Sequence, residues 1–178
     1  LSQISTGKRG DKFGVDKKMF FELVNYTKNS KNINLKCLSV HIGSQILDHK
    51  PYEKMLTVIN KIIKKSNHKF KFIDLGGGMG ISYKDKSKKL NYQKYNIAIK
   101  NFLKNNKSKI IFEPGRSIVG NTGSLISQVI YIKESNKKDF IILDAAMNDF
   151  MRPALYGANH KTLPAIKINK FSKKEYEF

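Results

Sequence analysis

Ile110-Ile111-Phe112-Glu113-Pro114-Gly115-Arg116 joins a short apolar run to a carboxylate, a Pro-Gly turn and an arginine. In two segments upstream an apolar run is likewise followed by polar residues or glycines. An apolar run from Leu35 leads into His41-Ile42-Gly43-Ser44-Gln45, and Phe72-Ile73-Asp74-Leu75 leads into Gly76-Gly77-Gly78. Polar residues and glycines directly after buried strands are typical of α/β barrels, which keep their chemistry at the carboxyl ends of parallel strands. The three segments therefore predict a ligand site.

The hydrophobic periodicity between these segments alternates between strands and helices. We expect strands at residues 35–42, 70–75 and 110–112, and helices at residues 16–27, 51–65 and 92–103. Strands that alternate with helices of this length pair in parallel through crossover connections. The pattern predicts an α/β fold, either a barrel or a doubly wound sheet.

Beyond Arg116 the sequence becomes β-rich. Residues 124–133 and 140–144 predict strands with no strong helix between them, and residues 175–178 resemble a further strand. Because Gly120-Asn121-Thr122-Gly123 supplies loop residues, we place a boundary there. The expected domains are residues 1–120 and residues 121–178.

The formal charge of +20 raises the question of nucleic-acid binding. Of the 34 basic residues 31 are lysines, scattered along the chain, and only Arg9, Arg116 and Arg152 are arginines. No arginine cluster, zinc-finger spacing or RNA-binding signature accompanies them. We favour a solvated lysine surface and no nucleic-acid partner, with a polyanion role as the less favoured alternative.

Cysteine content and hydropathy bear on the compartment. The single cysteine, Cys37, excludes an internal disulfide and fits a reducing compartment, and its apolar surroundings favour a core residue over a nucleophile. No apolar run approaches the ~18 residues of a membrane span. We expect a cytoplasmic protein with no membrane partner.

Each candidate site residue also has a structural interpretation. Gly76-Gly77-Gly78 suits a phosphate seat or a tight turn, and His41 suits a ligand contact or simple packing. Glu113 could hold a protonated ring nitrogen and Arg116 a phosphate or carboxylate, unless the two form a local ion pair. The other histidines, His49, His68 and His160, show no metal-ligand spacing, so no metal is expected.

A last group of polar residues lies at 144–156. Arg152 and Tyr156 are four residues apart, so they could share a face and present a cation and a phenol to a polar ligand. The alternative is a turn with a capping aspartate.

These motifs together resemble the fold-type III pyridoxal-phosphate-dependent decarboxylases, and most closely the diaminopimelate decarboxylases. The matching segments come in the family's order and span nearly the whole chain: residues 4–7, 12–14, 41–45, 74–78, 113–119, 147–149 and 152–156.

The resemblance implies a partial (β/α)8 TIM-type barrel followed by part of a β-sandwich domain, with pyridoxal phosphate at the barrel mouth. Residues 1–120 would be the C-terminal portion of the barrel. His41 would stack on the cofactor ring and Glu113 would keep its nitrogen protonated, which makes these two the catalytic candidates. The cofactor-binding residues would be His41, Ser44, Gly76, Gly77, Gly78, Glu113, Gly115 and Arg116.

The resemblance also implies the substrate. In the family the arginine and tyrosine that match Arg152 and Tyr156 contact the distal carboxylate end of the substrate, and Arg116 lines the substrate side. A distal carboxylate favours meso-2,6-diaminopimelate, converted to L-lysine and carbon dioxide, over ornithine, arginine or carboxynorspermidine. The family usually forms homodimers with shared active sites.

Two family features do not occur in these 178 residues. None of the 31 lysines has the Lys-Ala-Asn-type context of the lysine that binds the cofactor covalently, and the later Cys-Glu-Ser motif is missing. The family pattern places them before Leu1 and after Phe178. We expect an internal fragment, inactive by itself, of an ordinary enzyme. The alternative is a non-catalytic homologue with a binding or regulatory role.

Overall fold

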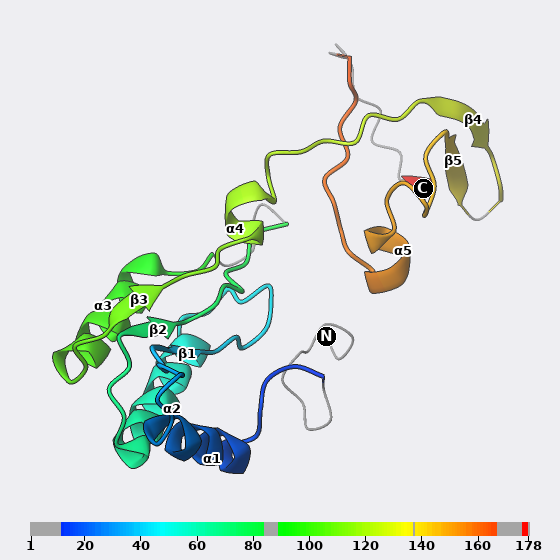
Figure 1. Cartoon of the computed structure of the whole chain (residues 1–178). Helices are drawn as coiled ribbons and strands as arrows, with labels where there is room; N and C mark the ends of the chain where they lie inside the picture. The colour runs from blue at the N-terminus through cyan, green and yellow to red at the C-terminus, as the bar shows by residue number, and fades with distance from the viewer. Residues whose placement is uncertain (1–11, 84–88, 137, 167–175, 178) are drawn as a thin grey trace. The chain divides into compact units, whose positions relative to one another are not determined.

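A computed structural model describes residues 12–83, 89–136, 138–166 and 176–177 (Figure 1). The chain divides into two compact units. The first comprises Leu1–Ser82 and Lys88–Thr122, and the second comprises Tyr83–Ser87 and Gly123–Phe178. The longer segment of the second unit thus begins at Gly123, within the loop predicted at residues 120–123.

The first unit is built on a parallel three-stranded sheet in the order β1-β2-β3. The strands are β1 (Cys37–Ser39), β2 (Phe72–Asp74) and β3 (Lys109–Ile111). Helix α2 (Lys50–Ser66) connects β1 to β2, and helix α3 (Tyr92–Lys104) connects β2 to β3. The α/β class and the parallel pairing expected from the sequence are therefore confirmed.

The helix ends follow from local side chains. Helix α1 (Lys17–Lys28) begins after Asp16, whose carboxylate accepts a hydrogen bond from the N–H of Met19 at 2.8 Å. Asn91 caps α3 in the same way, accepting from the N–H of Lys94 at 2.9 Å. Such side-chain acceptors satisfy N–H groups that the first helical turn leaves without partners. The three long helices predicted from the sequence all form.

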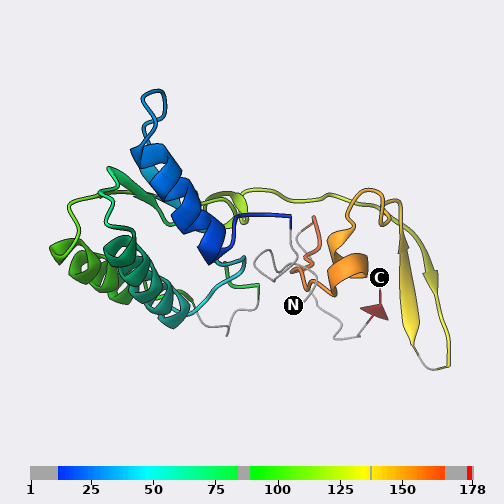
Figure 2. The ribbon, with the colours of Figure 1, turned by 60° about the horizontal axis from the view of Figure 1, so that its bottom comes forward.

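Helices α2 and α3 lie side by side in both views (Figures 1 and 2). The rings of Tyr52 on α2 and Tyr95 on α3 stack with their centroids 4.3 Å apart. The two helices pack with the sheet and α1 around one core, which consists of Val24, Leu38, Tyr52, Met55, Leu56, Ile59, Phe70, Ile73, Leu75, Met79, Leu90, Tyr95 and Phe102. Burial of each large side chain contributes about 1.5–3 kcal/mol, so this core fixes the sheet on which the candidate site lies.

All three regular strands end earlier than predicted, and β1 and β2 also begin later than predicted, at Cys37 and Phe72. Hydrogen bonds nevertheless continue past the strands, from the N–H of Val40 to Asp74 O at 2.9 Å and from the N–H of Leu75 to Ile111 O at 3.0 Å. At Gly76 the backbone turns into the left-handed region with φ 63°. The chain after β2 therefore bends there into the loop that carries the candidate glycines.

The second unit contains an antiparallel pair, β4 (Val129–Lys133) and β5 (Asp139–Leu143), with β6 (Tyr176–Glu177) parallel to β5. Two short helices were not predicted: α4 (Arg116–Val119) in the first unit and α5 (Arg152–Tyr156) in the second. Helices of four and five residues are too short to show a hydrophobic period.

Other expectations concern single residues and segments. Cys37 is half-buried, and burial raises the pKa of its thiol, which fits the predicted packing role. Among the described residues no group of three or more His, Cys, Asp or Glu side chains could hold a metal ion. None of the helices in the described ranges has the length and apolar character needed to cross a membrane.

Candidate functional site

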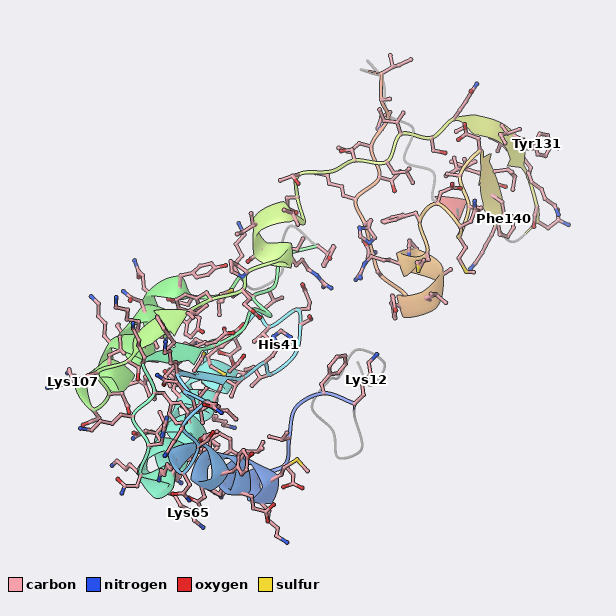
Figure 3. All side chains as sticks on the ribbon, viewed as in Figure 1. Lys12, His41, Lys65, Lys107, Tyr131 and Phe140 are labelled. Carbon is pink, nitrogen blue, oxygen red and sulfur yellow. The ribbon has the colours of Figure 1, made fainter. Side chains whose placement is uncertain are left out.

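The loops that follow β1, β2 and β3 lie against one another at the carboxyl edge of the parallel sheet. The N–H of Glu113 donates to Gly76 O at 2.8 Å, and the N–H of Gly77 donates to Nδ1 of His41 at 3.4 Å. The sheet order explains the contact, because β2 lies between β1 and β3. Three segments spread over more than 70 residues of sequence thus form one edge, on which His41 is labelled in Figure 3.

Glycine is required in the middle loop because its neighbours come too close for a side chain. A Cβ atom at Gly76 would lie 2.7 Å from Val40 O, and one at Gly77 would overlap the carbonyl oxygen of Glu113. At Gly78, where φ is 85°, a Cβ would overlap the carbonyl oxygen of Gly43. The three glycines therefore allow the backbones of all three loops to meet.

The N–H groups of the three glycines have different partners. The N–H of Gly76 donates to Oδ1 of Asp74 at 2.8 Å, and that of Gly77 to His41. Within the described part of the chain the Gly78 N–H forms no hydrogen bond. Of the three N–H groups in this described loop, that of Gly78 is therefore the one without a protein partner. Gly76 and Gly77 instead shape the loop.

The same hydrogen bond defines the state of His41. Its Nδ1 accepts a hydrogen bond from the N–H of Gly77, so in the neutral ring the proton resides on Nε2. His41 itself is exposed beyond β1. The imidazole is thus tied to the glycine loop through one nitrogen while its ring remains accessible.

Two buried side chains support the glycine loop from behind. Asp74, 8% exposed, accepts from Gly76 through Oδ1 and from the hydroxyl of Ser39 through Oδ2 at 3.0 Å. Tyr52, fully buried, donates its hydroxyl proton to Gly77 O at 3.3 Å. Burial raises the pKa of Tyr52, so the phenol remains a donor at any physiological pH.

The outer side of this edge is open. Ser44, Glu113 and Gly115 are exposed, and a Cβ atom at Gly43 or Gly115 would meet nothing within 4 Å. Among the described residues the carboxylate of Glu113 takes part in no hydrogen bond or ion pair. A carboxylate, a histidine ring and a backbone N–H without a partner among the described residues therefore belong to three loops that contact one another.

Arg116 forms a hydrogen bond with Gln45 and not the ion pair with Glu113 that the sequence left open. Its Nη1 donates to Oε1 of Gln45 at 3.0 Å. No ion pair joins Glu113 to Arg116 in the described structure, so the interpretation of these two residues as a local ion pair is wrong. Arg116 is partly buried at the start of α4, next to the Pro-Gly turn.

Arg152 and Tyr156 belong to the second unit. Both lie on α5, where the Arg152 guanidinium is 5.6 Å from the centroid of the Tyr156 ring. The capping turn considered as an alternative also forms, because Asp149 Oδ2 accepts from the N–H of Ala146 at 2.9 Å. The turn leads into the helix that brings the cation and the phenol together.

A second aspartate stabilises the start of this unit. The hydroxyl of Ser127 and the N–H of Gln128 donate to Asp144 at 2.7 and 2.8 Å. These bonds hold the pKa of the Asp144 carboxyl below its usual value. Asp144 thereby connects the segment before β4 to the end of β5.

Three further residues shape this site although no role was predicted for them: Gln45, Tyr52 and Asp74. The position of Asp74, two residues before a glycine N–H, could have indicated its turn-forming hydrogen bond. Tyr52 is one apolar position among many on α2, and no sequence signal separates it from an ordinary core aromatic.

Comparison with known proteins adds an independent line of evidence. Residues 1–120 match the family described as pyridoxal-dependent decarboxylase, pyridoxal binding domain. The diaminopimelate decarboxylase of Aquifex aeolicus is 42% identical over 165 residues, which cover 90% of this chain and 39% of that protein. The chain thus spans well under half the length of this relative.

Solved structures agree. The crystal structure of diaminopimelate decarboxylase from Helicobacter pylori complexed with L-lysine has a TM-score of 0.81 and 40% identity, covering 89% of this chain and 40% of that one. The Paramecium bursaria Chlorella virus arginine decarboxylase bound to agmatine, at 22% identity and a TM-score of 0.70 over 86% of this chain and 42% of that one, shares the fold. With the loops at the sheet edge and the match over residues 1–120, this chain belongs to the pyridoxal-dependent decarboxylase family.

Proposed function

We propose that the protein binds pyridoxal phosphate at the carboxyl edge of the β1-β2-β3 sheet and decarboxylates meso-2,6-diaminopimelate to L-lysine and carbon dioxide. The observation that carries the proposal is the meeting of His41, the Gly76–Gly78 loop and Glu113 at one open edge, in a chain of this family. The diaminopimelate decarboxylases with about 40% identity support the choice of substrate.

The residues at this edge fit the chemistry of the cofactor. A free carboxylate suits a protonated ring nitrogen, an exposed imidazole suits a flat ring, and the Gly78 N–H and Ser44 hydroxyl suit a phosphate. The backbones of Gly43 and Gly115 leave space where side chains would otherwise stand. When bound, pyridoxal phosphate supplies the electron-withdrawing ring that accepts the electrons released by decarboxylation.

Each residue then has one task. Glu113 keeps the ring nitrogen protonated, and His41 packs on the face of the ring. Gly78 and Ser44 donate to the phosphate. Arg116, with Gly115 beside it, offers a cation to the phosphate or to a substrate carboxylate.

Specificity is assigned to the second unit. Arg152 and Tyr156, which share a face of α5, would contact the distal carboxylate of diaminopimelate. This group distinguishes diaminopimelate from ornithine and arginine.

The remaining assignments follow the family pattern. We propose that residues 1–120 are part of a (β/α)8 barrel and residues 121–178 part of a β-sandwich, in a cytoplasmic homodimer whose protomers share active sites. The lysine that binds the cofactor covalently and the Cys-Glu-Ser motif would be supplied by sequence other than these 178 residues.

A second candidate is a related decarboxylase of ornithine, arginine or carboxynorspermidine. The viral arginine decarboxylase favours this candidate only at the level of the fold, since a shared fold does not determine the substrate. A non-catalytic homologue is a third candidate, because the family's lysine context does not occur in these residues.

The test is carbon dioxide release by the full-length protein with pyridoxal phosphate, offered meso-diaminopimelate, ornithine and arginine in parallel. We expect release from diaminopimelate alone. Release from another amino acid would retain the cofactor site and contradict the assignment of Arg152 and Tyr156. Release from none of the three, in a protein that has the lysine and Cys-Glu-Ser motifs, would favour the non-catalytic homologue.

A further inference from the structure

Gln45 makes three hydrogen bonds through one amide group. Its Nε2 donates to Ile81 O at 2.6 Å, and its Oε1 accepts from the N–H of Ile81 at 3.3 Å. The same oxygen accepts from Nη1 of Arg116 at 3.0 Å. One side chain thus joins the loop after β1 to the loop after β2 and to the residue that begins α4.

The backbone at this position is unusual. Gln45 has φ 60°, in the left-handed region that residues other than glycine rarely adopt. The neighbouring Ile46 forms a parallel bridge with Met79, and a Cβ at Gly80 would lie 3.1 Å from the Gln45 Cα. The two loops therefore hold Gln45 in a conformation that aims its amide at Ile81 and Arg116. Strain of this kind concentrates at functional sites.

The chemistry of the amide matters for Arg116. A carboxylate at this position would neutralise the guanidinium with a salt bridge, whereas an amide oxygen orients it and leaves its full charge. Only Nη1 takes part in a side-chain hydrogen bond within the described residues, so the other N–H groups of the guanidinium remain available. A guanidinium that is oriented but not neutralised suits the capture of an anion.

We propose that Gln45 is a positioning residue that acts through Arg116. Its amide fixes the guanidinium so that it binds an anionic group of the ligand, either the cofactor phosphate or a substrate carboxylate. This inference rests on the proposed function. The two bonds to Ile81 alone would suffice to join the loops, so the third bond, to Arg116, is the one that carries the proposal.

The test compares Gln45→Glu and Gln45→Met in the full-length protein. Gln93→Glu is the matched control, because Gln93 is exposed on α3 and the change in charge is the same. Three quantities are measured: the dissociation constant of pyridoxal phosphate for the apoprotein by absorbance titration, KM and kcat for diaminopimelate, and the melting temperature of the apoprotein.

Both Gln45 variants should bind the anion that Arg116 contacts about tenfold more weakly or worse, the loss expected for a hydrogen bond to a charged group. If the anion is the phosphate, the dissociation constant of pyridoxal phosphate rises. If it is a substrate carboxylate, KM rises while that dissociation constant is unchanged. Gln93→Glu should change neither.

Arg116→Met separates positioning from general support of the loops. In the double variant Gln45→Met/Arg116→Met, a Gln45 that acts through Arg116 adds little to the loss caused by Arg116→Met alone. The proposal is overturned if the loss of affinity in the double variant equals the product of the two single-variant losses. It is also overturned if the Gln45 variants bind as tightly as the control Gln93→Glu. If Gln45→Met fails to fold, Gln45→Asn decides by the same criteria, with Gln45→Asn/Arg116→Met as its double variant, because the shorter amide adds no charge beside the anion and asparagine tolerates the left-handed backbone.

The outcomes also separate this inference from the proposed function. A wild-type protein that binds pyridoxal phosphate, with Gln45 variants that are unaffected, contradicts only the role of Gln45. A wild-type protein that takes up neither pyridoxal phosphate nor diaminopimelate contradicts both.

Discussion

Individual residues at the sheet edge divide into those that bond to the protein and those that remain free. Asp74 and Tyr52 use their polar atoms to hold Gly76 and Gly77. The Glu113 carboxylate and the Gly78 N–H have no hydrogen-bond partner in the described part of the chain. Because leaving a polar group without a partner is costly unless solvent or a ligand satisfies it, the free groups are the ones to test for ligand contacts.

Glu113→Gln is the direct test at this scale. A neutral amide cannot stabilise a protonated ring nitrogen, so kcat of the full-length protein should fall about a hundredfold or more. The dissociation constant of pyridoxal phosphate should change little, since the proposed phosphate contacts of Gly78 and Ser44 are untouched. Steady-state kinetics and cofactor titration measure the two quantities, with exposed Glu22→Gln on α1 as the control. Equal losses in both would count against the role assigned to Glu113.

Secondary-structure elements explain how distant residues reach the same edge. Parallel strands linked by α2 and α3 put three consecutive loops side by side, and the missing side chains of the glycines let those loops touch. At Gly77 the loop after β2 passes so close to the carbonyl of Glu113 that no side chain would fit between them.

Gly77→Ala should therefore damage both the fold and the site. Its Cβ would overlap the Glu113 carbonyl oxygen, and relief of such overpacking typically costs about 1–3 kcal/mol. We expect a lower free energy of unfolding and weaker binding of pyridoxal phosphate, measured by urea unfolding and cofactor titration of the full-length protein. Gly123→Ala is the matched control, because a Cβ there meets nothing within 4 Å. Equal stability of the two variants would mean that the loops separate easily.

The elements also show what local sequence patterns can predict. Helices α2 and α3 were predicted within one residue at each end, because their apolar residues recur at helical spacing. The candidate motifs of the first unit were found because each follows an apolar run, and Arg152 and Tyr156 because they are four residues apart. The hydrogen bond between Gln45 and Arg116 could not be predicted, since the two residues are 71 positions apart and meet only through the packing of two loops.

At the scale of the whole chain, two opposed properties stand out. The formal charge is +20, and Figure 3 shows Lys65 and Lys107 projecting outward from the first unit. Large apolar side chains are also exposed, with Ile126 at 84% and Ile130 at 65%. All five residues of β4 are exposed. Repulsion between charges opposes association, whereas apolar surface favours it.

The balance predicts how the 178-residue chain behaves by itself. The distance over which charges interact shortens from about 10 Å at 0.1 M salt to about 3 Å at 1 M. Added sodium chloride should therefore weaken the repulsion and let the apolar surfaces associate, which light scattering across a salt series would detect. The double variant Ile126→Lys/Ile130→Lys should need more salt to associate, because it removes apolar area and adds charge. Scattering that falls as salt is added would show instead that attraction between opposite charges holds the particles together, for example through a bound polyanion. That result would favour the polyanion role, which the scattered lysines argue against.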